Sequence, residues 1–195
     1  MIYSLTATTH QLTGLLFGLL TVTIFNLFSL GTAFAGEMIL FFILVLFGSL
    51  LPDLDTPKSK LGRRFPFYFL SYPLYWLFGH RTWTHSFMFV VIVLIIGWII
   101  GFFLGWEWYL SSALAIGVAS HVAGDFFFDG GVPLFYPFQK RKYKFIVTAR
   151  TKRPNEINIS ENVVMFFLVV LNLWLGSLQL DVLPYAFSFL EGGDA

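Results

Sequence analysis

Long apolar stretches alternate with short polar ones along most of the chain. The apolar stretches cover Leu12–Phe34, Met38–Leu51, Ser86–Gly105, Trp108–Gly124 and Asn162–Leu180. A helix needs roughly 20 mostly apolar residues to cross the hydrocarbon core of a bilayer. Most of the stretches approach that length, and the short second one is expected to end at Pro52, whose ring cannot continue a helix. The pattern predicts an all-α, polytopic membrane bundle of about five transmembrane helices.

One aromatic segment does not fit the spanning pattern. Phe65–Phe78 reads FPFYFLSYPLYWLF and carries two prolines, Pro66 and Pro73. It is too short and too interrupted to cross a bilayer, while tyrosine and tryptophan are enriched where a membrane meets water. We expect this segment to be interfacial or re-entrant, and the sequence leaves those two alternatives open.

The composition agrees with the hydropathy pattern. The chain has 195 residues, of which 57% are hydrophobic and 12% charged, and its mean hydropathy is +0.76. These values exclude a soluble domain, and we expect residues 1–195 to form a single integral-membrane domain. The absence of cysteine excludes disulfides and thiolate metal ligands. Ala33-Phe34-Ala35 resembles a signal-peptidase site, but residues 1–11 lack Lys and Arg, so we expect a retained first span.

The basic residues are distributed on one side of the predicted topology. Five crossings put the amino terminus and the segments 53–85 and 125–161 on one side, and the turns at Glu37 and Glu107 on the other. All twelve Lys and Arg residues then fall on the first side. The positive-inside rule makes that side cytoplasmic. We therefore expect a multi-pass inner-membrane protein with a cytoplasmic amino terminus and a carboxyl terminus on the opposite side. The basic loops are explained by topology and by anionic lipid headgroups, without a nucleic-acid partner.

The same topology places all four histidines and several carboxylates on the cytoplasmic side. Imidazole and carboxylate side chains at helix ends can converge on metal ions, and mixed ligation of this kind suits zinc, with manganese as the alternative. His121 and Asp125 are four residues apart, so they share one face of a helix. The converging residues are His10, Asp53, Asp55, His80, His85, His121, Asp125 and Glu161.

Several of these residues also have an ordinary structural explanation. His80 and His85 could be interfacial, hydrogen-bonded side chains. Asp55 could cap a turn with Thr56-Pro57, and Glu161 could complete a capping box that begins at Asn158. The metal hypothesis therefore depends on convergence of the whole set rather than on any single residue.

Several motifs resemble a known family. Thr9-His10, Gly48–Asp55 (GSLLPDLD), Gly79-His80-Arg81 with Thr84-His85-Ser86, His121–Asp125 (HVAGD) and Gly130–Pro133 (GGVP) are similar to motifs of the membrane-bound metal-dependent hydrolases of bacteria and archaea, the YdjM-like proteins. With Glu161 they extend over nearly the whole chain. The resemblance implies a hydrolase, and a remoter likeness to zinc-dependent phospholipase C and P1-type nucleases implies phosphodiester chemistry. The chain has Ile157 where those enzymes have a histidine.

These observations predict a metal-dependent hydrolase that cleaves a phosphoester, with a lipid-like substrate, at the cytoplasmic membrane face. His10, Asp53, His80, His85, His121, Asp125 and Glu161 are the expected metal ligands. Asp55 is the expected ligand or general base, and Arg81 the expected phosphate clamp.

The alternative is a metal or proton transporter, or a metal-sensing subunit without hydrolytic activity. Transporters place ionisable groups near the bilayer midplane. The span centres here offer Asn26 and Asn172 but no charge, which favours the hydrolase. The oligomeric state is left open.

Overall fold

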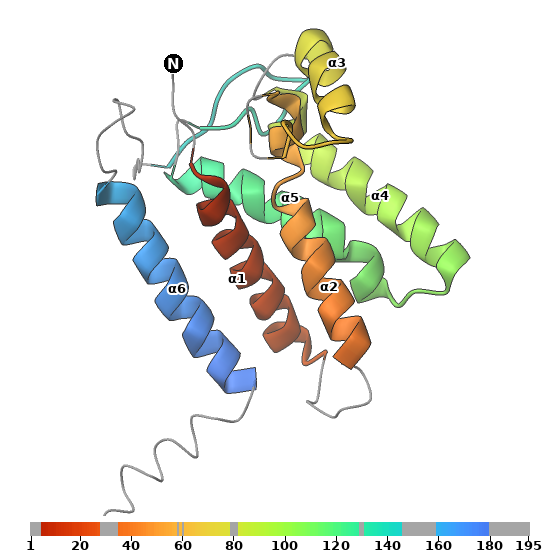
Figure 1. Ribbon diagram of the computed structural model, residues 1–195, viewed down its shortest axis with the longest axis vertical. Helices are drawn as coiled ribbons and strands as arrows, with labels where there is room; N and C mark the ends of the chain where they lie inside the picture. Colours follow the sequence, from red (N-terminus) through yellow and green to blue (C-terminus); the bar gives the residue numbers. More distant parts are fainter. Residues whose placement is uncertain are drawn as a thin grey trace, which may run out of the picture.

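The computed structural model describes residues 5–27, 35–57, 59, 61–78, 82–128, 131–145 and 159–179. This part of the chain is built from helices joined by turns (Figure 1). The helices are α1 (Ala7–Phe25), α2 (Ala35–Gly48), α3 (Tyr68–Phe78), α4 (Phe87–Leu104), α5 (Trp108–Phe128) and α6 (Ile159–Gln179), with short 3-10 turns η2 (Pro52–Asp55) and η3 (Trp83–His85).

The described residues contain five helices that are long and apolar enough to cross a membrane. They correspond to α1, α2 extended through η2, α4, α5 and α6. The predicted all-α membrane bundle is therefore confirmed, and α4 agrees closely with the expected Ser86–Gly105 span. Ser86 caps α4 by accepting a hydrogen bond from the Phe89 N–H, and Gly105 ends it in the left-handed conformation.

The first span differs from the prediction. Helix α1 begins at Ala7 rather than Leu12, because the Thr6 hydroxyl accepts a hydrogen bond from the Thr9 N–H and caps the helix. It ends at Phe25, where Asn26 adopts a left-handed conformation with φ 46°. Residues 28–34 of the expected span lie outside the described residues. Asn26 therefore lies at a helix end, whereas the sequence had predicted it at a span centre.

Helix α2 ends at Gly48 rather than at Leu51. Pro52 does not terminate the helix but starts the turn η2, where a proline in the first position needs no N–H partner. The last backbone bonds of α2 continue to Ser49, whose N–H donates to the Val45 carbonyl. This turn carries Asp53 and Asp55 to the end of the bundle.

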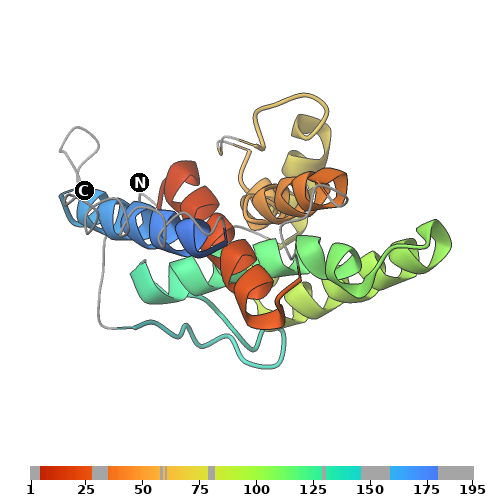
Figure 2. The same ribbon diagram turned by 90° about the horizontal axis from the view of Figure 1, so that it is seen from below.

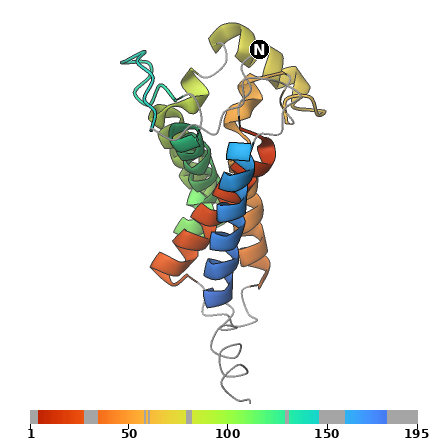
Figure 3. The same ribbon diagram turned by 90° about the vertical axis from the view of Figure 1, so that its left-hand side faces the viewer.

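The aromatic segment forms the helix α3, with Pro73 inside it. Figures 1 and 3 place α3 beyond the ends of α1 and α2, at the end of the bundle that carries the amino terminus. It packs against η2, while Phe69 is 68% and Trp76 84% exposed. Aromatic side chains presented outward beside the bundle end suit the interfacial alternative better than the re-entrant one.

Helix α5 is the centre of the bundle and packs against α1, α2 and α4. Small residues let the backbones approach closely at two crossings. A Cβ added to Gly117 would lie 2.8 Å from the Cα of Gly48 on α2, and one added to Gly101 on α4 would lie 2.9 Å from the Cβ of Ser111. Close crossings through small residues are typical of helix packing in membranes.

Helix α6 joins the bundle mainly through α1 (Figure 2). The Asn172 side chain donates to the Leu12 carbonyl at 3.1 Å, and Gln179 donates to the Thr23 hydroxyl at 2.8 Å. Figure 1 shows the starts of α1, α4 and α6 and the ends of α2 and α5 at one end of the molecule. This arrangement brings the candidate site residues together.

Candidate metal centre

The candidate ligands come from four different elements and meet in the interior. His10 belongs to α1, Asp53 and Asp55 to η2, His85 to η3, and His121 and Asp125 to the last turns of α5. All of them are fully buried except Asp53, whose side chain is 13% exposed. Ionisable side chains are rarely buried unless they pair with one another or bind a metal.

A backbone carbonyl fixes the orientation of His121. Its Nδ1 lies 2.7 Å from the Ser49 carbonyl oxygen. A carbonyl only accepts, so Nδ1 carries the proton and Nε2 is the acceptor nitrogen. The Ser49 carbonyl can serve His121 because it follows the end of α2, where carbonyls have no partner within the helix. The ring of His121 also stacks on that of His10, with centroids 3.8 Å apart.

A hydroxyl and a carboxylate fix the orientation of His85. The Thr84 hydroxyl donates to Asp55 Oδ2 at 2.6 Å and lies 3.0 Å from His85 Nδ1. Because the single hydroxyl proton is already donated to Asp55, Thr84 accepts from Nδ1, which leaves Nε2 as the acceptor nitrogen of His85. Asp55 Oδ2 itself is 3.5 Å from Nδ1. The Thr56 hydroxyl holds the other carboxylate oxygen at 3.0 Å.

The two acceptor nitrogens face each other. His85 Nε2 and His121 Nε2 are 3.2 Å apart, and Asp125 Oδ2 lies 3.4 Å from the first and 3.8 Å from the second. Three electron-pair donors therefore converge at distances where they repel one another unless a proton or a metal ion lies between them. Two imidazoles and a carboxylate are a ligand set that suits zinc or manganese, so the residues fit the predicted metal.

A second group of possible ligands shares His121. One ligand atom from each of His10, Asp53 and His121 lies within 4.8 Å of the others, as it does for His85, His121 and Asp125. Asp125 connects the groups, because its Oδ1 is 3.6 Å from His10 Nε2 while its Oδ2 faces His85. A carboxylate with one oxygen toward each group is arranged as in sites that hold two ions.

The surroundings of His85 raise its affinity for a proton. Burial lowers the pKa of His85, but the hydrogen bond and charge of Asp55, with the charges of Asp125 and Asp53, outweigh it and leave the pKa above the usual value of 6.5. The same negative field favours a divalent cation. A proton and a metal ion would therefore compete for this imidazole.

Glu161 lies at a different position from the two groups. Its Oε1 accepts hydrogen bonds from the Thr6 N–H and the Thr9 hydroxyl, each at 2.7 Å. These contacts fasten the start of α6 to the start of α1, one residue before His10. Among the described residues Glu161 belongs to neither group of close ligand atoms. Asn158 of the suggested capping box lies outside the described residues, as do His80 and Arg81.

Two positioning groups were not expected from the sequence. The Ser49 carbonyl is a backbone group, so no side-chain pattern indicates it. Thr84 could have been found, because it is adjacent to His85 and a hydroxyl beside a histidine is a common orienting partner. The structure thus brings His10, Asp53, Asp55, His85, His121 and Asp125 together.

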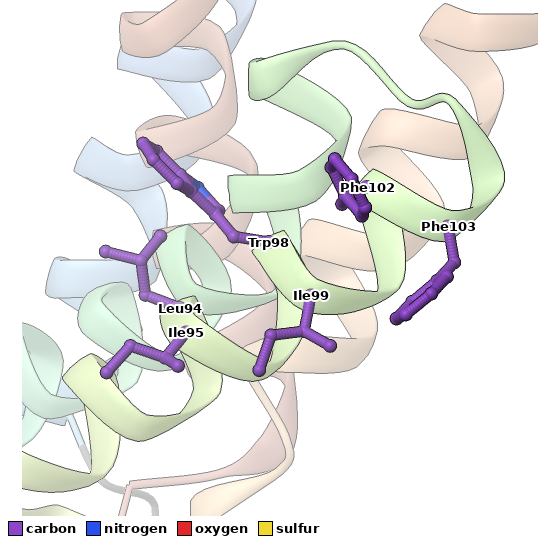
Figure 4. A pocket seen from close by; sticks show the side chains of 6 residues that line it. All are labelled: Leu94, Ile95, Trp98, Ile99, Phe102 and Phe103. Atoms are coloured by element: carbon purple, nitrogen blue, oxygen red, sulfur yellow. The ribbon is translucent and has the colours of Figure 1, made fainter.

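A pocket elsewhere in the molecule is unsuited to chemistry. It lies on the outer face of α4 and is lined by Leu94, Ile95, Trp98, Ile99, Phe102 and Phe103 (Figure 4). All of these side chains are apolar or aromatic, and α4 is a candidate membrane span. The pocket is a lipid-facing surface feature rather than part of the metal centre.

Comparison with known proteins places the chain among inner-membrane proteins. Residues 5–182 match the family model described as YdjM inner membrane protein. The chain is 32% identical over 132 residues to the inner membrane protein YdjM of Escherichia coli (strain K12), covering 65% of this chain and 61% of that relative. It is 38% identical over 94 residues to the uncharacterized protein YvsG of Bacillus subtilis (strain 168), covering 46% of this chain and 52% of that relative. The chain thus spans between half and two thirds of the length of these relatives. No solved structure matches it.

Proposed function

The chain belongs to the YdjM inner membrane protein family, and we propose that it is a membrane-bound, metal-dependent hydrolase that cleaves a phosphoester at the cytoplasmic membrane face. The proposed substrate is lipid-like, because a membrane lipid reaches a site at the end of a helix bundle by lateral diffusion. The name of the Escherichia coli relative specifies the inner membrane but no reaction, so the proposal depends on the site.

The observation that carries the proposal is the meeting of His85 Nε2, His121 Nε2 and Asp125 Oδ2. The hydrogen bonds of the two Nδ1 atoms leave both Nε2 atoms as acceptors in the neutral imidazoles, the third atom is a carboxylate oxygen, and all three side chains are buried. The Nδ1 atoms of the two histidines are held from outside the cluster by the Ser49 carbonyl and the Thr84 hydroxyl, and the two Nε2 atoms point at one another.

A divalent ion held by these residues, zinc before manganese, would supply a water of lowered pKa and polarise a phosphoryl oxygen. The chain supplies the orientation. Asp55 and Thr84 keep the Nδ1 proton of His85 on the side away from the ligand nitrogen, and the Ser49 carbonyl does the same for His121. These contacts favour Asp55 as a positioning residue over its alternative as the general base.

Arg81 is proposed as the phosphate clamp. It lies outside the described residues, but it precedes the turn η3 that delivers His85. A guanidinium near the metal centre would bind phosphate oxygens in a bidentate manner and stabilise charge that develops during cleavage. The cytoplasmic assignment rests on the one-sided distribution of Lys and Arg in the sequence.

Metal content tests the proposal directly. Elemental analysis of purified protein is expected to find zinc or manganese in the wild type and none in His85→Ala or Asp125→Asn, while both variants still insert into membranes. Ser112→Ala is the matched control, because this buried α5 hydroxyl bonds to Trp98 and the Trp108 carbonyl, away from the cluster.

The second step is a hydrolysis screen of phosphodiester and phosphomonoester lipids with and without chelator. We expect chelator-sensitive cleavage by the wild type and at least a hundredfold loss in both ligand variants. Normal metal content in His85→Ala and Asp125→Asn would remove the site assignment. Metal flux into proteoliposomes without hydrolysis of any lipid would instead support the transporter alternative.

A further inference from the structure

An apolar groove of about 410 Å³ lies beside the metal centre. Three helices that are candidate membrane spans form it, so it lies at the depth of lipid acyl chains. Helix α1 forms the floor, and α5 and α6 form the walls. Residues representing the three sides are Thr13 and Phe17, Gly124 and Phe127, and Val164 and Leu171.

The groove exists because α5 and α6 both pack against α1 but, among the described elements, do not pack closely against each other. In Figure 2, α1 lies beside α6 and crosses α5, and the end of α5 lies on the same side of α1 as α6. The α5 wall is lined partly by the small residues Ala123 and Gly124, which leave space that larger side chains would fill.

One end of the groove lies next to the candidate ligands. A Cβ added to Gly124 would lie 3.6 Å from His10 Nδ1 and 3.5 Å from the Thr13 hydroxyl oxygen. Gly124 directly precedes Asp125, and Thr13 donates to the His10 carbonyl at 2.8 Å. The groove wall and the candidate ligands are thus neighbours in the same helical turns.

The other end of the groove extends along α6 toward the bilayer interior. Val164 and Leu171 both line it, and seven helical residues correspond to about 10 Å of length. The exposed rings of Phe127 and Phe167 border the groove on the α5 and α6 sides. An extended apolar ligand that enters from the lipid would bury its surface here without any polar contact to satisfy.

We propose that this groove binds an acyl chain of the substrate lipid while the phosphoester headgroup lies at the metal centre. The inference rests on the proposed function for the headgroup, and on the groove itself for the chain. It defines the substrate class as a phosphoester with at least one long hydrocarbon chain, because the groove leads from the ligands into the hydrocarbon core.

A pair of neighbouring substitutions on α6 tests chain binding. Val164→Trp fills the groove, whereas Val163→Trp adds the same side chain at a position that is 48% exposed and does not line it. Native mass spectrometry in detergent would measure binding of dioleoyl phosphatidic acid. We expect wild type and Val163→Trp to bind alike and Val164→Trp to bind at least tenfold more weakly, with unchanged metal content.

A second pair tests the length of the groove and protects against a folding defect at Val164. Leu171→Trp blocks the far end, and Val170→Trp is its exposed control at 48%. Leu171→Trp is expected to weaken dioleoyl phosphatidic acid at least fivefold while leaving dihexanoyl phosphatidic acid unchanged. The inference would be overturned if Val164→Trp and Leu171→Trp bound each lipid as tightly as their exposed controls Val163→Trp and Val170→Trp. An altered oligomeric mass with unchanged lipid binding would also overturn it, by assigning the groove to a second copy of the chain.

The two proposals fail in different ways. If the groove variants lose lipid binding while the wild type hydrolyses no phosphoester, the groove stands and the proposed function falls. If the wild type hydrolyses long-chain and chainless substrates equally well and Val164→Trp changes neither rate, the function stands and the groove falls.

Discussion

The two halves of α5 are both buried, but for different reasons. In the first half, Ser111 and Gly117 allow α4 and α2 to approach closely, and the requirement is purely one of space. In the last turns, His121 and Asp125 are buried among other ionisable side chains, and the requirement is one of charge and hydrogen bonding. The comparison shows that one span can hold the bundle together at one end and carry a cluster of ionisable side chains at the other.

The two halves of α5 also differ in which substitutions they tolerate. At the α2–α5 crossing an atom added to Gly117 collides with backbone, so even a methyl group forces the helices apart. In the polar cluster each side chain depends on partners that set its protonation and direction. The following predictions use this difference.

The largest effect is expected at the α2–α5 crossing. A Cβ on Gly117 would lie 2.8 Å from both Gly48 Cα and Ser49 N, so Gly117→Val must separate two backbones. We expect a loss of about 3 kcal/mol or more, seen as loss of monodisperse protein in detergent and a lower thermal midpoint. Separation would also move the Ser49 carbonyl away from His121.

Gly176→Val is the control for that experiment. A Cβ at Gly176 on α6 has nothing within 4 Å, so the same change of residue type should leave yield and metal content near those of the wild type. Normal behaviour of Gly117→Val would show that the crossing is more adaptable than its geometry indicates, and the contrast between the halves of α5 would fail.

The next effect concerns the orientation of His85. Thr84→Val removes the hydroxyl that donates to Asp55 and accepts from His85, while keeping the size of the side chain. We expect metal affinity to fall roughly 10- to 100-fold, as is usual when a partner of a ligand histidine is lost, with little change in folding. Competition with a chelating dye measures the affinity. Thr84→Ser should restore it, and equal affinities in all three proteins would exclude the positioning role.

The pH dependence of stability follows from the raised pKa of His85. A histidine whose pKa is higher in the folded protein contributes stability that is full below its unfolded value of 6.5 and is lost as the pH rises through the folded pKa. A zinc ion bound at the imidazole would take the place of the proton. Chelated protein should therefore become less stable as the pH rises above about 6.5, and added zinc should stabilise the protein more at about pH 8 than at about pH 6.

Thermal midpoints with and without zinc across this range would check the pH prediction. Asp55→Asn removes a main cause of the raised pKa and should move the loss of stability to lower pH. A zinc effect that is the same at every pH would contradict competition at His85.

The sequence predicted the scaffold better than the details of the site. Hydropathy indicates spans because each crossing needs a long apolar run, and the resulting topology places His10, His85 and His121 at one end. It could not indicate the Ser49 carbonyl, since every residue has one, nor the start of α1 at Ala7, which depends on the Thr6 cap. Glu161 is a second example of a detail that the sequence does not determine. Its carboxylate is a suitable metal ligand, but its described contacts fasten α6 to α1.

The smallest effect is expected at the end of the bundle opposite the cluster. The Tyr109 hydroxyl donates to Glu37 Oε2 at 2.6 Å and joins the starts of α5 and α2. Tyr109→Phe keeps the ring, which is edge-on to Phe41 with centroids 6.4 Å apart, and removes only the hydrogen bond. We expect a loss of about 1 kcal/mol in thermal stability with metal content and affinity unchanged, because partly exposed hydrogen bonds contribute little net free energy. A change in metal affinity would mean that the two ends of α5 are coupled through the helix. The division of α5 into a packing half and a chemical half would then be wrong.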